Sequence, residues 1–304
     1  MVTLKQLTVF AKLAETRNMG EAAAALGTSQ PALSQQLAAL EKTLGIRLFE
    51  RVPKGLSLTP RGRKLLDSAE GVLTAMREFA DAADHQAQRY AGSIRFGVTP
   101  TLGPYLMPAV IKTVHERYPG IRIFIREGIP DRQHVELAAG RLDMILSPMP
   151  IEGRSLHVEP LFREPLHIVV PPDDPLTEKG LIEQKDLAGR TFLTLDHRHH
   201  YHRQLEDICR RLDAAILSDY EGTSLDALQQ MVGSGVGLAI LPELYIRSGA
   251  GGLDMVAICD PDGWSEYRSI AAAWRSSAAF TDLYAEIAAI VAQEARQKLE
   301  SDNI

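Results

Sequence analysis

The stretch AAAALGTSQPALSQQLAALEKTLGIRLFER, residues 22–51, decides the fold of the amino-terminal part of the chain. An alanine-rich helical segment ends at Gly27. Ser29 and Pro31 then mark a helix start, because serine caps free N–H groups and proline is tolerated in the first helical turn. The next helix is expected to bury three leucines at helical spacing, Leu33, Leu37 and Leu40. The stretch predicts a helix, a tight turn, and a helix over 31–43 whose outer face is polar.

Positive charge surrounds a short hairpin just after this helix. A Pro/Gly turn at 52–56 separates the apolar segments 48–49 and 56–58 and predicts a wing. The basic residues around it are Arg47, Arg51, Lys54, Arg61, Arg63 and Lys64. Glutamine and serine can bond base edges while lysine and arginine hold phosphates. These features predict double-stranded DNA as a partner.

Composition fits a soluble protein that meets a polyanion through its first fifth. Residues 1–65 hold ten Lys/Arg against four Asp/Glu, about +6, so the rest carries about −12 within a net charge of −6. The 304 residues predict two or three domains. No apolar run approaches a membrane span and no signal segment precedes the first helix, so we expect a cytoplasmic protein without membrane contact. The two cysteines, Cys209 and Cys259, fit a reducing compartment.

Residues 22–51 and the segment LSLTPRG at 56–62 resemble the winged helix-turn-helix of the LysR-type transcriptional regulators, and the similarity covers residues 4–65. The resemblance implies a DNA-binding surface on the second helix, its turn and the wing: Ser29, Gln30, Pro31, Ser34, Gln35, Arg51 and Lys54. At Asn18-Met19-Gly20 the family more often has a serine or threonine cap and an aromatic residue. The helix that starts there is therefore expected to be less firmly capped.

Between Leu65 and Ala83 the apolar residues recur in threes and fours, which is the pattern of a coiled-coil seam. An isolated helix with such a stripe can pack on its own body or on a second copy. We expect a dimer, so that two recognition helices read two half-sites. The family resemblance adds assembly into tetramers.

The remaining chain alternates strand and helix patterns, which predicts α/β structure with a mostly parallel sheet. It resembles the two-lobed, periplasmic-binding-protein-like effector domain of the same family. We therefore expect a winged helix-turn-helix domain at 1–65, a linker and dimerisation helix at 66–90, and an effector domain at 91–304. The effector domain would comprise lobe I (91–161 and 269–304) and lobe II (162–268).

Ligands of open α/β sheets bind at the carboxyl ends of strands, here in the cleft between lobes. The expected effector-binding residues are Thr99, Thr101, Gly128, Pro130, Ser147, His199, His200, His202, Thr223 and Ser224. No nucleophile elbow and no zinc-protease motif occurs, and the glycine-rich segment 233–237 has the reverse of dinucleotide-binding order. We expect no catalytic residues, no enzyme activity and no cofactor.

The segment LDHRHHYHRQLEDIC, residues 195–209, is open to three interpretations. His199, His202 and Glu206 would share one helix face, a partial ligand set for zinc, nickel or copper. The segment could instead be a solvated loop. The favoured interpretation is an anion clamp, in which imidazoles at a helix N-terminus bind a carboxylate.

Within the family, the expected effector domain is most similar to the peroxide-sensing OxyR-like branch. The segments that carry this similarity include PTLGPYLMP at 100–108 and TSLDALQQMVGSGVGLAILP at 223–242. In that branch a His-Cys pair supplies the reactive thiol, and a cysteine nine positions later resolves it. Cys209 matches the second cysteine, which places His200 at the reactive position. An imidazole cannot enter the thiol oxidation series, so peroxide sensing by that route is not expected.

We therefore expect a LysR-type regulator controlled by a small organic anion, a carboxylate, bound between its lobes. The alternative is a metal-responsive or redox-responsive regulator of the same fold. A solute-binding or enzymatic α/β protein with an incidental basic head is a less favoured class.

Overall fold

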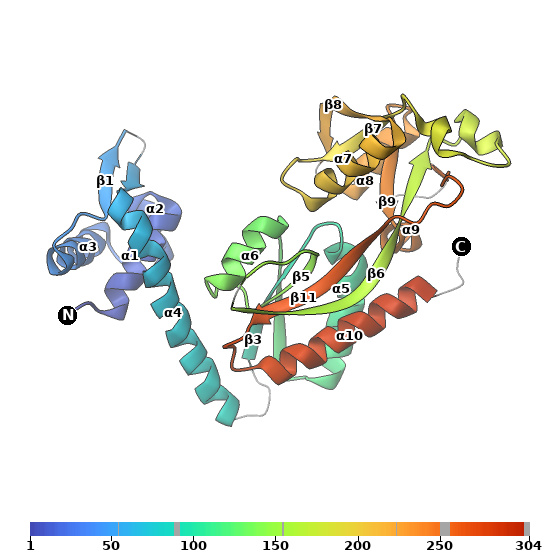
Figure 1. Cartoon of the computed structure of the whole chain (residues 1–304). Coiled ribbons are helices and arrows are strands. Elements are labelled where there is room, and N and C mark those ends of the chain that lie inside the picture. The colour runs from blue at the N-terminus through green and yellow to red at the C-terminus, as the bar shows by residue number, and fades with distance from the viewer. Residues whose placement is uncertain (54, 88–91, 154, 223, 250–255, 301–304) are drawn as a thin grey trace. The chain divides into compact units, whose positions relative to one another are not determined.

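The computed structural model describes residues 1–53, 55–87, 92–153, 155–222, 224–249 and 256–300. Its contacts divide the chain into two compact units, the first formed by 1–87 with 139–141 and the second by 88–138 with 142–304. Figure 1 shows both units and labels most of their helices and strands. Within the described part of the chain, no helix is long and apolar enough to cross a membrane.

The first unit begins with three helices whose starts are all capped by side chains. They are α1 (Leu4–Thr16), α2 (Met19–Ala25) and α3 (Gln30–Leu44). The Ser29 hydroxyl accepts from Ala32 N and Pro31 lies in the first turn of α3, as predicted. The carboxamide oxygen of Asn18 accepts from Gly20 N at 2.8 Å and Glu21 N at 3.3 Å. The expectation of a weakly capped α2 was therefore wrong, because asparagine caps as well as serine does.

The wing is a two-stranded antiparallel hairpin, β1 (Phe49–Val52) and β2 (Gly55–Leu58). The Glu41 carboxylate at the end of α3 accepts from Leu48 N at 2.7 Å and Phe49 N at 3.2 Å. This contact fixes the wing to α3. A buried core beneath them joins α1, α3 and the wing, and includes Phe10, Leu13, Leu33, Leu40, Leu48 and Leu56.

A long helix, α4 (Pro60–Ala87), follows the wing. Three of the large apolar residues at the predicted seam are not covered by this chain, whereas Ala69 is buried against the core of the first unit. Val72 is 48%, Met76 47% and Phe79 70% exposed. Three large apolar side chains in one exposed stripe are unusual on a monomer surface, which favours the predicted packing against a second copy.

The second unit is built on a mixed sheet with the order β10-β6-β11-β5-β3-β4, and β9 pairs with β6. Its strands are β3 (Gly92–Val98), β4 (Ile121–Glu127), β5 (Met144–Pro148), β6 (Leu156–Val170), β9 (Ala239–Pro242), β10 (Ala257–Ile258) and β11 (Tyr267–Arg275). Only β3, β4 and β5 run parallel, whereas β6 and β11 pair antiparallel with their neighbours. The prediction of a mostly parallel sheet was wrong, because two long strands connect the halves of this unit.

We call the part around β3, β4 and β5 lobe I. Its helices are α5 (Gly103–Arg117), α6 (Pro130–Ala138) and α10 (Thr281–Glu300). In Figure 1, α10 and α5 lie together beside the long strands. Trp274 and Ala272 on β11 join the core with α5 and α10, while Ala271 and Ala273 face Leu137 of α6. The alternation of β11 thus buries both sheet faces.

We call the other half lobe II. It holds β7 (Thr191–Leu195) and β8 (Ala215–Gly222), which are parallel, together with β9 and β10. Its helices are α7 (His200–Leu212), α8 (Leu225–Gly233) and α9 (Glu243–Arg247), with short 3-10 turns at Pro175–Glu178 and Gln184–Leu187. Phe192 of β7 and Ile240 of β9 share a buried cluster with Ile208 of α7. The core of lobe II therefore holds α7 in place.

A series of charged side chains in contact connects three segments of lobe II. The His167 imidazole lies between Asp260, with Nδ1 2.6 Å from Oδ2, and Glu243, with Nε2 2.5 Å from Oε2. Glu243 also pairs with Arg247. Burial opposes the charge, but the hydrogen bonds to Asp260 and Glu243 outweigh it and raise the pKa of His167 to about 9. At neutral pH the ring is protonated, its Nδ1 donates to Asp260, and its Nε2 lies in ion-pair contact with Glu243.

This arrangement predicts an alkaline loss of stability. Because the folded-state pKa of His167 lies above its unfolded value, the stabilisation is complete below the unfolded pKa and disappears as pH rises through about 9. We expect about 2 kcal/mol of unfolding free energy to be lost over that range. Urea denaturation between pH 6 and pH 10 measures it, with His167→Gln as the control that should show a flatter profile. Equal profiles for the two proteins would contradict the assignment.

Candidate functional site: the α7 pocket

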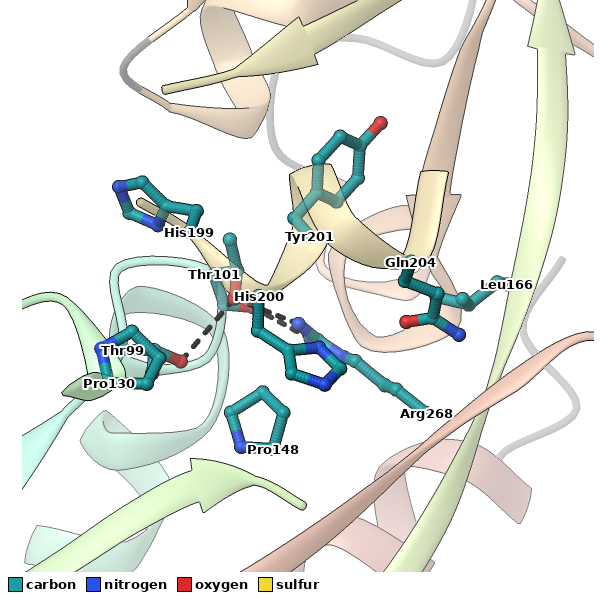
Figure 2. A pocket seen from close by; sticks show the side chains of 10 residues that line it. All are labelled: Thr99, Thr101, Pro130, Pro148, Leu166, His199, His200, Tyr201, Gln204 and Arg268. Atoms are coloured by element: carbon teal, nitrogen blue, oxygen red, sulfur yellow. Dashed lines mark hydrogen bonds between the residues drawn. The ribbon is translucent and has the colours of Figure 1, made fainter. Parts of the chain in front are cut away.

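A pocket opens where the start of α7 in lobe II faces lobe I. Its lining residues are Thr99, Thr101, Pro130, Pro148, Leu166, His199, His200, Tyr201, Gln204 and Arg268, and we call it the α7 pocket. Figure 2 shows Thr101, His200 and Arg268 around one space, with Pro130 and Pro148 at its edge. Five of the predicted effector residues belong to lobe I, and three of these, Thr99, Thr101 and Pro130, line the pocket together with His199 and His200.

A buried ion pair forms one wall of the pocket. Arg268, 6% exposed, donates from Nε to Oε2 of the fully buried Glu164 at 2.7 Å. Its Nη1 donates to Thr101 Oγ1 at 2.8 Å, and its Nη2 to the Thr101 carbonyl at 2.9 Å. The other Glu164 oxygen accepts from Leu244 N at 2.8 Å, at the start of α9. A single chain of bonds therefore runs from the pocket threonine to lobe II.

The two histidines of the pocket are uncharged at neutral pH. Burial lowers the pKa of both His199 and His200. The His200 ring hydrogen-bonds the Met149 backbone carbonyl, next to β5 of lobe I. His199 is the residue before the first turn of α7 but makes no side-chain cap. Two uncharged imidazoles supply less positive charge for a carboxylate than the anion-clamp interpretation needs.

The other histidines of the segment lie outside the pocket. His202 Nδ1 is 2.9 Å from Thr194 Oγ1, and its Nε2 is 3.4 Å from Glu206. The His197 side chain is 67% exposed beside Asp196. No three His, Cys, Asp or Glu residues of the described chain come together as a metal site. The proposed set of His199, His202 and Glu206 is thus not assembled here.

Several residues that were predicted to line the cleft instead make hydrogen bonds with nearby backbone groups. Ser147 is fully buried and its Oγ bonds the Pro148 carbonyl at 3.4 Å. Ser224 caps α8, accepting from Ala227 N at 3.2 Å, and Gly128 N donates to the Val98 carbonyl at 3.0 Å. None of these three lines the α7 pocket. Thr223 lies outside the described residues.

Contacts at the rim join α7 to lobe I and to β11. The Arg203 guanidinium pairs with Asp131 of α6 through two contacts of 3.3 Å, and both side chains are largely exposed. Gln204 Nε2 donates to the Tyr267 carbonyl at 2.9 Å. Exposed ion pairs contribute little to stability, so this rim can open at small cost.

The predicted DNA-binding residues form a separate surface on the first unit. Ser29, Gln30, Pro31, Ser34 and Gln35 are all exposed at the start of α3, and Arg51 is exposed on the wing. Lys54 lies outside the described residues. Helix α3 buries its leucines and leaves its polar side free, the arrangement that a recognition helix needs.

Both cysteines are buried in lobe II, Cys209 at 3% and Cys259 at 4% exposure, and neither forms a disulfide. Burial raises the pKa of the Cys209 thiol to about 11. Burial, followed by Asp174 and Asp260, also raises the pKa of Cys259. Since the thiolate is the reactive form, both thiols are inert in the folded protein.

We therefore expect both cysteines of the native protein to react with an aromatic disulfide reagent at least about 100-fold more slowly than a small free thiol at pH 7. The same reagent should titrate both thiols rapidly in urea. Absorbance at the wavelength of the released thiolate measures the rate. Fast labelling of one cysteine in the native protein would contradict the burial argument.

Comparison with known proteins places the chain in a family. Residues 4–63 match the model "Bacterial regulatory helix-turn-helix protein, lysR family", and residues 87–296 match "LysR substrate binding domain". The chain belongs to the LysR family of transcriptional regulators. It is a DNA-binding transcription regulator with an effector domain and not an enzyme, as the sequence predicted.

Its similar relatives are named for hydrogen peroxide. This LysR-type regulator is 34% identical to a probable hydrogen peroxide-inducible genes activator of Streptomyces viridosporus, over 97% of its own length and 95% of the relative's. It is 31% identical to the DNA-binding transcriptional dual regulator OxyR of Escherichia coli K12, over 81% and 80%. The predicted similarity to the OxyR-like branch is thereby confirmed.

Two solved structures carry the same likeness. A full-length OxyR cysteine-to-aspartate variant from Pseudomonas aeruginosa has a TM-score of 0.75 and 28% identity, covering 96% of this chain and 95% of that one. A hydrogen-peroxide-bound cysteine-to-serine variant of Corynebacterium glutamicum OxyR has a TM-score of 0.65 and 30% identity, covering 98% and 94%. The architecture of this LysR-type regulator is therefore that of OxyR.

Sequence reasoning missed the Arg268–Glu164 pair of this regulator. The two residues lie directly opposite each other in the β11–β6 register, so the pairing of two strands that are distant in sequence brings them together. The sequence carried little signal for it, because Glu164 follows Arg163 and Arg268 precedes Ser269, so neither is an isolated charge among apolar residues. Buried charges are kept only when they are paired, but no local pattern indicated that these two are buried.

Proposed function

We propose that this LysR-type regulator reads its signal by reversible binding of a small, uncharged polar molecule in the α7 pocket, and not by oxidation of a thiol. Hydrogen peroxide is the first candidate for that molecule. Residues 1–65 would bind operator DNA, 66–90 would form a dimer, and 91–304 would receive the signal. The observation that carries the proposal is the neutral pocket wall made by Arg268, Glu164 and Thr101.

The charge of the pocket supports an uncharged ligand. The positive charge of Arg268 is offset by Glu164 at 2.7 Å, and burial lowers the pKa of His199 and His200 so that both are neutral. An anion would have to leave water for a site without net positive charge, which is costly. A molecule with hydroxyl groups can instead exchange hydrogen bonds with Thr99, Thr101 and the imidazoles.

The size of the pocket supports a ligand of few atoms. Its enclosed volume is about 10 Å³, close to the space that a single water molecule needs. Hydrogen peroxide has only two heavy atoms. The names of the relatives give further support, since two similar proteins are named probable hydrogen peroxide-inducible genes activators and a solved OxyR variant that lacks a cysteine is described as peroxide-bound.

A small organic anion, the carboxylate that the sequence suggested, is the second candidate. The observation in its favour is the start of α7, which has no side-chain cap and whose free N–H groups attract negative charge. A carboxylate larger than formate would need the lobes to separate at the Arg203–Asp131 rim. The ligand would act by favouring one arrangement of the lobes over another.

Thermal unfolding of the full chain with each ligand tests the proposal. We expect hydrogen peroxide, at up to about 10 mM, to raise Tm reversibly, with the shift removed by catalase and absent from a Thr101→Val/His200→Ala variant. His197→Ala, which changes an exposed neighbour, should respond like the wild type. Stabilisation of the wild type by acetate but not by peroxide would favour the second candidate. A peroxide shift that catalase does not reverse would contradict reversible binding.

A further inference from the structure

Glu164 contacts no ligand position, yet it controls the charge of the α7 pocket. It lies on β6 opposite Arg268 of β11 and is 0% exposed. One carboxylate oxygen accepts from Arg268 Nε at 2.7 Å and the other from Leu244 N at 2.8 Å. The pocket residue Thr101 accepts from the other two guanidinium nitrogens, Nη1 and Nη2. Glu164 is not part of the pocket lining and contacts it through the guanidinium that it neutralises.

We propose that Glu164 is the specificity-determining residue of the α7 pocket: it positions and neutralises Arg268 and thereby makes the pocket reject small anions. The inference rests on the proposed function, because it concerns the same pocket. An arginine without a carboxylate partner in a buried site is a strong anion ligand, since its planar N–H groups match oxyanions. With Glu164 present, an entering anion meets a second negative charge behind the guanidinium.

The remaining charges at the pocket do not change this balance. Arg203 is paired with Asp131 at the rim. The pKa values of His199 and His200 are lowered, so neither ring adds positive charge. Arg268 is the charged residue among those that line the α7 pocket, and Glu164 is the carboxylate that pairs with it, so neutralising Glu164 would leave the pocket lining positive.

A purely structural role for Glu164 makes a different prediction. If the carboxylate only fastened β11 to α9, its loss would destabilise the protein equally in every salt. The chain contains a matched control for that case. Asp143, 4% exposed, accepts from Arg95 at 2.8 Å and lies 3.7 Å from the buried Arg275, and it does not line the α7 pocket.

The test compares Glu164→Gln and Asp143→Asn with the wild type, as full-length proteins. Both amides keep the side-chain volume and remove a buried negative charge. Tm is measured against sodium nitrate and sodium formate, with ionic strength held constant by sodium gluconate, whose anion is too large for the pocket. We expect both variants to melt below the wild type in gluconate. In about 100 mM nitrate only Glu164→Gln should recover, by about 3 °C or more, with an apparent nitrate affinity at least about 10-fold above the wild-type value.

An equal nitrate response of Glu164→Gln and Asp143→Asn would overturn the inference and leave Glu164 a structural residue. If Glu164→Gln does not fold, Glu164→Asp takes its place, because its shortened carboxylate cannot reach both Arg268 and Leu244. We then expect a smaller stabilisation by nitrate. The absence of any stabilisation by nitrate would overturn the inference. If nitrate and formate already stabilise the wild type as strongly as Glu164→Gln, the neutral-ligand proposal itself fails. The two failures are thus distinguishable.

Discussion

Replacing Arg268 by methionine is expected to lower the free energy of unfolding by about 3–5 kcal/mol. The substitution leaves the Glu164 carboxylate fully buried without its cation, while Thr101 loses both of its donors. A buried charge that loses its partner costs far more than the pair contributes when intact. Urea denaturation monitored by circular dichroism measures the change at pH 7.

The double variant Glu164→Met/Arg268→Met should recover most of this loss, because two apolar side chains can replace a buried pair at little cost. Arg210→Met, which removes an exposed partner of Asp207 on α7, should change stability by no more than about 0.5 kcal/mol. A loss below about 1 kcal/mol for the single Arg268 variant would show that water reaches the pair and that the pocket wall is not buried as described.

Replacing Gln35 and Arg51 together by alanine is expected to weaken operator binding by about 100-fold or more. Gln35 is exposed on α3 and Arg51 on the wing. A base-edge contact contributes about 1–3 kcal/mol of discrimination, and a phosphate contact contributes affinity that falls with salt. Fluorescence anisotropy, with a duplex selected by the wild-type protein from a random pool, measures both.

The two single variants separate these roles. Gln35→Ala should relax sequence preference with little change in salt dependence, whereas Arg51→Ala should weaken all duplexes alike and reduce the salt slope by about 1. Lys12→Ala, which removes a charge already paired with Glu15 on α1, is the control and should bind almost as the wild type does. Full affinity in the double variant would contradict the recognition-helix assignment.

The helices and the wing of the first unit could be predicted closely from sequence, because the residues that start and end them are close together in the chain. Ser29 and Pro31 start α3 where predicted, and the wing forms at the expected Pro/Gly turn. Caps and turns act within about four residues of the chain, so a single sequence contains all the partners involved. Even there, Asn18 was undervalued, although its side chain satisfies two amides of α2.

The second unit was harder to predict from sequence, because the residues that pair with each other in it lie far apart in the chain. Strand β6 runs for 15 residues, but Pro160 and Pro165 interrupt its pattern, so its full length does not follow from the sequence pattern. Glu164 and Arg268 are separated by 104 positions and meet through the register of β6 and β11. The direction and register of strands in a sheet depend on which strands pair in the folded protein, and hydrophobic periodicity does not indicate this pairing.

The histidine segment shows the same limit. Its helix start was predicted near His199, and α7 does begin at His200. The position of Met149 in lobe I and the Arg268–Glu164 pair together determine which imidazole rings face the pocket. The spacing of residues within 195–209 contains no information about either. The anion clamp was a reasonable interpretation of four histidines and two arginines, but burial and pairing change the charge on which it relied.

The account rests on reversible binding in the α7 pocket instead of thiol oxidation, and a cysteine-free regulator tests this most directly. Operator binding by Cys209→Ala/Cys259→Ala is compared with and without hydrogen peroxide, beside Thr101→Val/His200→Ala with both cysteines intact. The account predicts that the cysteine-free protein responds as the wild type does and that the pocket variant does not respond. A response that disappears with the cysteines and persists in the pocket variant would contradict it.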